Sequence, residues 1–105
     1  MSAEKIFEAL SSAPRRRILA FLSKTDMNAG DIARRFEMSQ PAVSKHLSIL
    51  ENAGIIWREK RGQHVHYGLN EAALSATLVH FLAEVCPRSR PLRRESAAVA
   101  RGKKG

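Results

Sequence analysis

The stretch MSQPAVSKHLSIL, residues 38–50, decides the fold of this chain. Val43, Leu47 and Leu50 recur at the spacing of one helical face. Ser39 can cap this helix, and Pro41 falls in its first turn, where a missing N–H breaks no helical hydrogen bond. The opposite face carries short polar and basic side chains: Gln40, Ser44, Lys45 and Ser48. The pattern predicts a short helix that buries one face and offers a polar face to a partner.

A second short helix precedes this one. Asn28 can cap it, with Asp31 three positions later, and its apolar residues Ile32, Ala33 and Phe36 share one face. The helix of residues 40–53 ends at Gly54, which readily takes the left-handed conformation of a helix end. Two short helices joined by a tight turn predict a helix-turn-helix over about residues 29–53.

Two further helices are predicted nearer the N-terminus. Ser2 caps the first, over about residues 3–11, and Pro14 begins the second, which has an apolar stripe at helical spacing. Arg15, Arg16 and Arg17 cluster at the start of the second helix, where the helix dipole disfavours cations. They are either ordinary surface charge or neighbours of an anion or a carboxylate.

After Gly54 the apolar period changes from 3.6 to 2. The run IIWREKRGQHVHYGLN predicts strands over about 55–60 and 64–69, joined by a tight turn in which Gly62 takes a positive φ. Asn70 then caps a last helix, EAALSATLVHFLAEV, which is apolar on most of its circumference. A helix of this kind in so small a chain predicts burial against a second subunit.

Charge divides the chain into a domain of residues 1–86 and a tail of residues 87–105. The domain holds 11 Lys/Arg against 9 Asp/Glu, whereas the tail holds 7 Lys/Arg and a single acidic residue. The tail is typical of a disordered or loosely helical segment that either keeps the protein in solution or contacts phosphates. With a net charge of +8, the chain is expected to bind a polyanion.

Other features narrow the class of protein. A single cysteine, Cys86, excludes an internal disulfide and suits a reducing cytoplasm. No apolar run approaches the roughly 18 residues of a membrane span, so a cytoplasmic protein is predicted. No nucleophile elbow, Gly-rich phosphate loop or acid–base constellation indicates an enzyme, and no cofactor motif is found.

About five helices and two strands, with a hairpin after a helix-turn-helix, predict a mainly α winged helix-turn-helix. Such a fold places its second helix in the major groove of double-stranded DNA. The predicted base contacts are Gln40, Ser44, Lys45 and Ser48. The predicted phosphate contacts are Ser39, Arg34, Arg35, Arg58, Lys60 and Arg61, although Arg34 and Arg35 also fit a plain solvated face. His46 borders the packed face and is either a structural histidine bonded to backbone or a base reader.

Three stretches of the sequence resemble a known family, over about residues 4–85 together. FEALSSAPRRRILAFL, AGDIARRFEMSQPAVSKHLSILENAGII and REKRGQHVHYGLN resemble the ArsR-type winged-helix repressors, most closely their metal-independent SdpR-like branch. The resemblance implies a homodimer, held by the first and last helices, that represses transcription from pseudo-palindromic operators. The interface residues so predicted are Ile6, Phe7, Leu10, Leu74, Leu78, Phe81, Leu82 and Val85.

Metal sensing, common among ArsR-type proteins, is not predicted. The positions that match the family's Cys-x-Cys pair are Asn28 and Gly30, which supply no thiolate. The positions that match its last-helix site are Glu71, Ala73, Glu84 and Pro87, which lack a histidine.

The remaining candidate ligands are three histidines and one cysteine. His64 and His66 share a strand face but lack further ligands, so they suit cross-strand packing or a phosphate, and His80 is expected at the interface. Cys86 is either a simple thiol or half of an intersubunit disulfide. Two alternatives to a constitutive repressor stay open: a sensor gated by metal or thiol chemistry, and a module whose last helix binds another protein.

Overall fold

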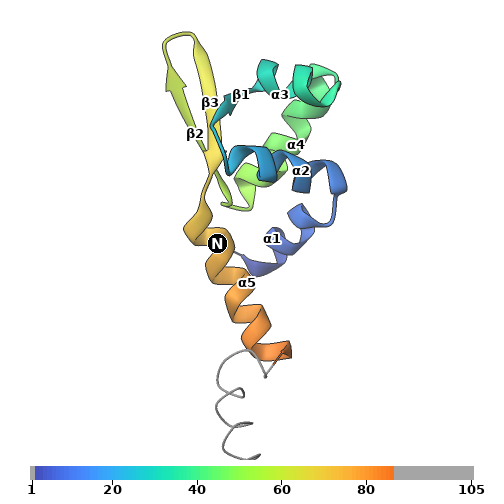
Figure 1. Cartoon of the computed structure of the whole chain (residues 1–105), viewed down its shortest axis with the longest axis vertical. Coiled ribbons are helices and arrows are strands. Elements are labelled where there is room, and N and C mark those ends of the chain that lie inside the picture. The colour runs from blue at the N-terminus through green and yellow to red at the C-terminus, as the bar shows by residue number, and fades with distance from the viewer. Residues whose placement is uncertain (1, 87–105) are drawn as a thin grey trace, which may run out of the picture. The chain divides into compact units, whose positions relative to one another are not determined.

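The computed structural model describes residues 2–86, which form five helices and one three-stranded sheet. The elements run α1 (Ala3–Leu10), α2 (Ala13–Leu22), β1 (Met27–Asn28), α3 (Ala29–Phe36), α4 (Gln40–Asn52), β2 (Ile56–Arg61), β3 (His64–Leu69) and α5 (Glu71–Val85) (Figure 1). The predicted winged helix-turn-helix is confirmed. The predicted tail, residues 87–105, lies outside the described residues.

The helices begin at side-chain caps. The Ser2 hydroxyl accepts from the Lys5 N–H at 3.3 Å, and Asn28 with Asp31 forms a reciprocal capping box at the start of α3. The start predicted for α2 at Pro14 is wrong by one residue. Ser12 caps this helix by accepting from the Arg15 N–H at 3.3 Å, so α2 already begins at Ala13 and the proline lies within its first turn.

The sheet has the order β1-β3-β2, with both pairs antiparallel. The predicted hairpin is present, and Gly62 in its turn has a φ of 63°. The sequence did not indicate β1, because a strand of two residues is too short to show a period. Its pairing of Met27 with Tyr67 and of Asn28 with His66 ties the start of α3 to the wing strand β3 (Figure 1).

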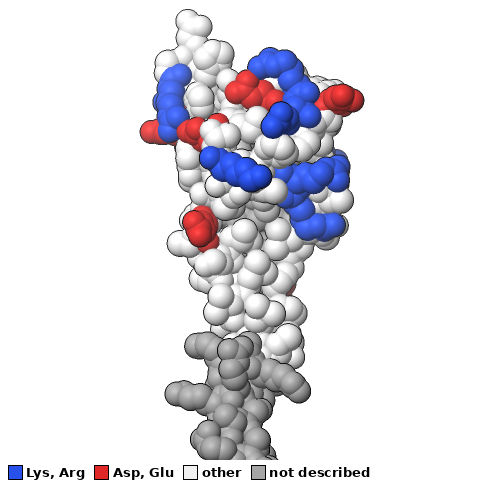
Figure 2. Space-filling model, viewed as in Figure 1, with Lys and Arg blue, Asp and Glu red and all other residues white. Residues whose placement is uncertain are grey.

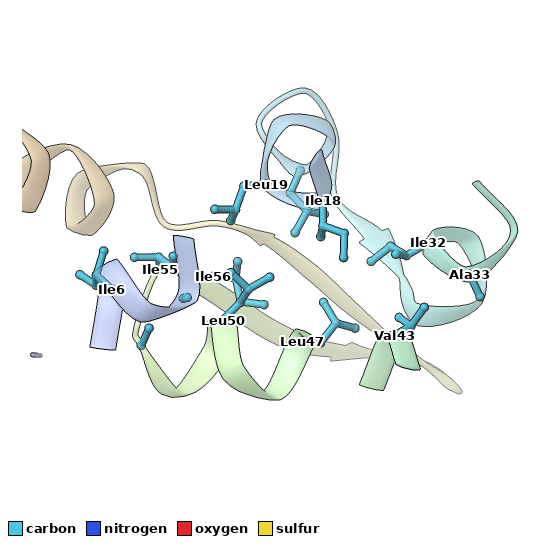
Figure 3. Close-up of a cluster of buried hydrophobic side chains, with 13 residues drawn as sticks. Ile6, Ile18, Leu19, Ile32, Ala33, Val43, Leu47, Leu50, Ile55 and Ile56 are labelled. Atoms are coloured by element: carbon cyan, nitrogen blue, oxygen red, sulfur yellow. The ribbon is translucent and has the colours of Figure 1, made fainter. Parts of the chain in front are cut away.

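One hydrophobic core joins helices α1 to α4 with the first residues of β2. Ile18 of α2, Ile32 of α3 and Val43 of α4 are fully buried and lie in the same cluster (Figure 3). The cluster also contains Ile6 of α1 with no exposed surface. The predicted dimer interface is therefore corrected to exclude Ile6, because its side chain has no surface left for a second subunit.

Among the described residues, 2–74 form one compact unit and 75–86 belong to a second. Within the first unit, Ala73 and Leu74 at the start of α5 pack against the core. In the part of α5 within the second unit, Val79, Leu82 and Val85 expose 57%, 46% and 53% of their surface. No helix of the described residues is long and apolar enough to cross a membrane.

Candidate nucleic-acid interface

The two faces of α4 separate as the apolar spacing predicts. Val43, Leu47 and Leu50 expose 2% or less of their surface. The predicted base-contact residues Gln40, Ser44, Lys45 and Ser48 are all exposed. Because the buried face fixes the rotation of α4 about its axis, these four side chains point away from the core.

The start of α4 is fixed by its cap and by an unusual turn. The Ser39 hydroxyl accepts from the Ala42 N–H at 3.3 Å. Before it, Glu37 ends α3 in the left-handed conformation, with φ 54° and ψ 46°, and the Met38 N–H donates to the carbonyl of Ala33 at 3.0 Å. Glu37 thus ends α3 two residues before the cap of α4. The left-handed conformation of Glu37 could not be predicted from the sequence, because a glutamate rarely adopts a positive φ.

The two arginines of α3 are exposed and lie in different surroundings. Arg34 pairs with Asp31 at 2.6 Å, one turn earlier in the helix. The guanidinium of Arg35 lies 4.4 Å from the ring centroid of Phe21, which itself meets Phe36 edge to face at 5.3 Å. Both cations remain on the surface, and an aromatic ring orients the second.

The wing divides its basic residues between its two faces. Directly opposed residues share a face, so Arg58 lies with Tyr67 and Lys60 with Val65. Arg61 lies on the other face, where its guanidinium contacts Asp26 at 2.6 Å and Glu59 at 2.7 Å. The hydrogen bonds that Arg61 donates to Glu59 and, second, to Asp26 raise its pKa. Two carboxylates thus already neutralise this predicted phosphate contact.

A hollow of about 360 Å³ lies between the helix-turn-helix and the wing. Its lining residues come from the start of α3, the start of α4 and the end of the hairpin: Asn28, Ala29, Gly30, Arg34, Gln40, Gln63, His64, Val65 and Tyr67. Gln40 and Arg34 were predicted site residues. Gln63 and Tyr67 were not, since only the hairpin register brings them beside α4.

The charge on this part of the molecule is mixed. Figure 2 shows basic side chains over the helices and on the wing, with acidic ones between them. This agrees with the near balance of 11 Lys/Arg and 9 Asp/Glu in residues 1–86. A polyanion would therefore meet separate basic contacts here rather than a continuous basic surface.

The arginines at the start of α2 have partners that neither interpretation of the sequence foresaw. The Arg15 guanidinium donates to the carbonyl oxygens of Ala9 at 2.7 Å and Glu8 at 3.1 Å, and Arg16 donates to that of Leu10 at 2.6 Å. These carbonyls end α1, where the helix dipole is negative. Two of the three arginines thus cap the preceding helix.

His46 is a packing residue, but its partner differs from the predicted backbone group. Its Nδ1 lies 3.4 Å from a guanidinium nitrogen of Arg15. Burial, followed by the positive charges of Arg15 and Lys45, lowers the pKa of His46. These surroundings favour the neutral imidazole.

Among residues 2–86, no three His, Cys, Asp or Glu side chains come together as a metal site. Asn28 is occupied as the cap of α3, while His80 contacts Glu84 at 3.4 Å. His66 pairs across the sheet with Glu59, and its Nδ1 is buried without a hydrogen-bond partner. Cys86 is a free, exposed thiol, and Pro87 lies outside the described residues.

Comparisons with known proteins agree with this geometry. The model of the family described as "Bacterial regulatory protein, arsR family" matches residues 12–57. The chain is 42% identical over 73 residues to the transcriptional repressor SdpR of Bacillus subtilis, covering 70% of this chain and 81% of that protein. It is 30% identical over 73 residues to the transcriptional activator HlyU of Vibrio cholerae, covering 70% of this chain and 68% of that protein.

A solved structure shares this fold. An ArsR-like transcriptional regulator from Rhodococcus sp. RHA1 superposes with a TM-score of 0.74 at 29% identity, covering 94% of this chain and 90% of that one. The relatives are transcriptional regulators rather than enzymes, as the sequence predicted. The chain belongs to the arsR family of bacterial regulatory proteins.

Proposed function

We propose that the chain is a homodimeric, sequence-specific DNA-binding repressor of the cytoplasm that acts on pseudo-palindromic operators without a metal effector. The observation that carries the proposal is the outward polar face of α4, held in place by the buried Val43, Leu47 and Leu50. A helix of this kind, exposed beside a wing, suits the major groove. Its contact residues are those predicted: Gln40, Ser44, Lys45 and Ser48.

Phosphate contacts would flank these base contacts. The Ser39 hydroxyl and the N–H of Gln40 suit one phosphate, whereas Pro41 has no N–H and that of Ala42 donates to Ser39. Arg34 and Arg35 on α3, with Arg58 and Lys60 on the wing face that carries Tyr67, suit others. Arg61 is assigned a weaker share, because its two carboxylates must be released or screened first.

Repression is proposed from the name of one relative, the repressor SdpR, whereas HlyU is named an activator. The direction of control therefore needs its own measurement. Transcription in vitro from a promoter that carries the selected site should fall as protein is added. A rise would make the protein an activator that uses the same DNA-binding face.

The homodimer is proposed from the exposed apolar surface of α5, which includes Val79, Leu82 and Val85. Light scattering of the whole chain should give twice the monomer mass, and Leu82→Glu should shift it toward the monomer. Thr25→Glu, which adds the same charge at an exposed position outside α5, is the matched control. A stable wild-type monomer would instead favour the alternative that α5 binds a different protein.

Independence from metal is proposed because the family's metal positions hold Asn28 and Gly30 in one site and Glu71, Ala73 and Glu84 in the other. Calorimetry with Zn²⁺ should show no binding tighter than that of surface histidines. Operator affinity should be equal with a chelator and with added Zn²⁺. A metal-dependent loss of affinity would restore the sensor alternative.

Base reading is tested by selecting duplexes from a random pool with the purified protein and then measuring variants on the selected site. Gln40→Ala and Ser44→Ala should each weaken binding to that site by about 1–3 kcal/mol and leave binding to random duplex unchanged. Asn52→Ala, an exposed change at the far end of α4, is the control. Equal losses on selected and random duplexes would contradict the assignment.

A further inference from the structure

Arg15 links three helices through one side chain. From α2, its guanidinium donates to the carbonyl oxygens of Ala9 and Glu8 at the end of α1. A third guanidinium nitrogen lies 3.4 Å from Nδ1 of His46 on α4. We call these contacts the Arg15 brace. The brace connects the end of α1 with the helix that carries the proposed base contacts.

The chemistry of the brace depends on the charge of the imidazole. A guanidinium has only donors, so Arg15 can bond to Nδ1 only while that nitrogen carries no proton. Protonated His46 offers a donor at both nitrogens and a positive charge. The contact would then change from a hydrogen bond to a repulsion between two cations.

The groups around His46 offer no compensation. The charges that act on it are Arg15, from α2, and Lys45, its neighbour on α4, and both are positive. The end of α1 contributes backbone carbonyls, which Arg15 already occupies. Within residues 2–86, no carboxylate forms an ion pair with His46. A proton on His46 therefore destabilises this arrangement of helices.

We propose that Arg15 positions the recognition helix α4 through His46, and that acidification releases this contact and weakens selective DNA binding. The inference rests on the proposed function and adds a positioning pair and a pH response to it. His46 lies one residue before the buried Leu47 and two after Ser44 of the polar face. A shift of His46 would therefore move the base contacts relative to the wing.

The direction of the pH effect follows from the depressed pKa of His46. The neutral form is favoured in the folded chain, whereas the unfolded chain has the ordinary value of 6.5. The stabilisation by the brace is complete above pH 6.5. It is lost as the pH falls from 6.5 through the lower pKa of the folded protein.

Two variants separate the contact from general acid sensitivity. In His46→Asn, the amide oxygen takes about the position of Nδ1 and accepts from Arg15 at every pH. His46→Lys places a permanent cation against Arg15. Asn52→Ala is the matched control, because it changes an exposed residue of the same helix and leaves the brace intact.

The experiment measures the ratio of affinities for the selected duplex and for random duplex at pH 7.5 and pH 5.5. For wild type and for Asn52→Ala, the ratio should fall by about fivefold or more at pH 5.5. His46→Asn should keep its ratio at both values, and His46→Lys should have the low ratio already at pH 7.5. The same fall in wild type and in His46→Asn would overturn the proposal.

A second measurement works without DNA. Titration of the His46 ring by NMR in the whole chain should give a midpoint below 6.5 in wild type and a higher one in Arg15→Gln. An unchanged midpoint would overturn the brace, even if DNA is bound selectively. If the wild type selects no duplex at pH 7.5, the repressor proposal and the pH response both fail, and the titration still decides whether Arg15 acts on His46.

Discussion

The guanidinium of Arg61, at the end of β2, lies 2.6 Å from the carboxylate of Asp26, the residue that precedes β1. This pair ties the tip of the wing to the short strand that leads into α3. Glu59 contacts the same guanidinium at 2.7 Å, so Arg61 already has two carboxylate partners within the chain. Lys60, on the opposite face of β2, forms no ion pair among the described residues.

The two neighbours should therefore differ in how they affect binding to random duplex. Lys60→Ala should reduce the slope of log K against log salt by about 0.9, the value of one phosphate contact. Arg61→Ala should change the slope much less, because its charge is already balanced by Asp26 and Glu59. Fluorescence anisotropy over a salt series measures both slopes.

Asp26→Asn is a useful third variant for the wing. It removes one of the two carboxylates and should make Arg61 more available to phosphate, raising affinity for random duplex. The loss in stability should be small, because the pair is partly exposed. Equal slopes for Lys60→Ala and Arg61→Ala would show that Arg61 leaves its carboxylates on binding.

The turn between α3 and α4 allows a prediction about stability. Glu37 has a φ of 54°, a conformation that costs a residue with a Cβ about 1 kcal/mol and costs glycine far less. Glu37→Gly should therefore raise the free energy of unfolding by up to about 1 kcal/mol, measured by urea denaturation. Glu37→Ala, which removes the charge and keeps the Cβ, should give no such gain.

The opposite change at the end of α4 tests the same argument. Gly54 has a φ of 81°, so Gly54→Ala should destabilise the fold by about 1 kcal/mol or more. If Glu37→Gly is neutral or destabilising, the carboxylate of Glu37 must contribute more than its backbone strain costs. Selective DNA binding should survive Glu37→Gly, because the exposed face of α4 is untouched.

The parts of this molecule that follow from local chemistry could be predicted from the sequence. The caps at Asn28 and Ser39, the turn at Gly62 and the buried face of α4 depend on residues within a few positions of one another. These features were enough to identify the fold and the exposed polar face. They also predicted a left-handed stop at Gly54, which the structure confirms.

The features that the sequence did not predict depend on contacts between segments far apart in the chain. No periodicity indicates that Asp26 meets Arg61, that Gln63 and Gln40 line one hollow, or that Arg15 reaches both α1 and His46. These contacts decide which cations are available to a partner and which already have one. The sequence therefore identifies the basic residues but does not predict which of them are available to contact DNA.

The tail of residues 87–105 provides the last prediction, which rests on its charge alone. Deleting residues 88–105 removes seven of the 18 Lys/Arg of the chain. Each phosphate that the tail contacts contributes about −0.9 to the slope of log K against log salt, so the deletion should flatten this slope on selected and random duplexes alike. The ratio of the two affinities should stay the same, because the polar face of α4 is intact. An unchanged slope, together with lower solubility of the shortened chain, would show that the tail serves solubility rather than DNA binding.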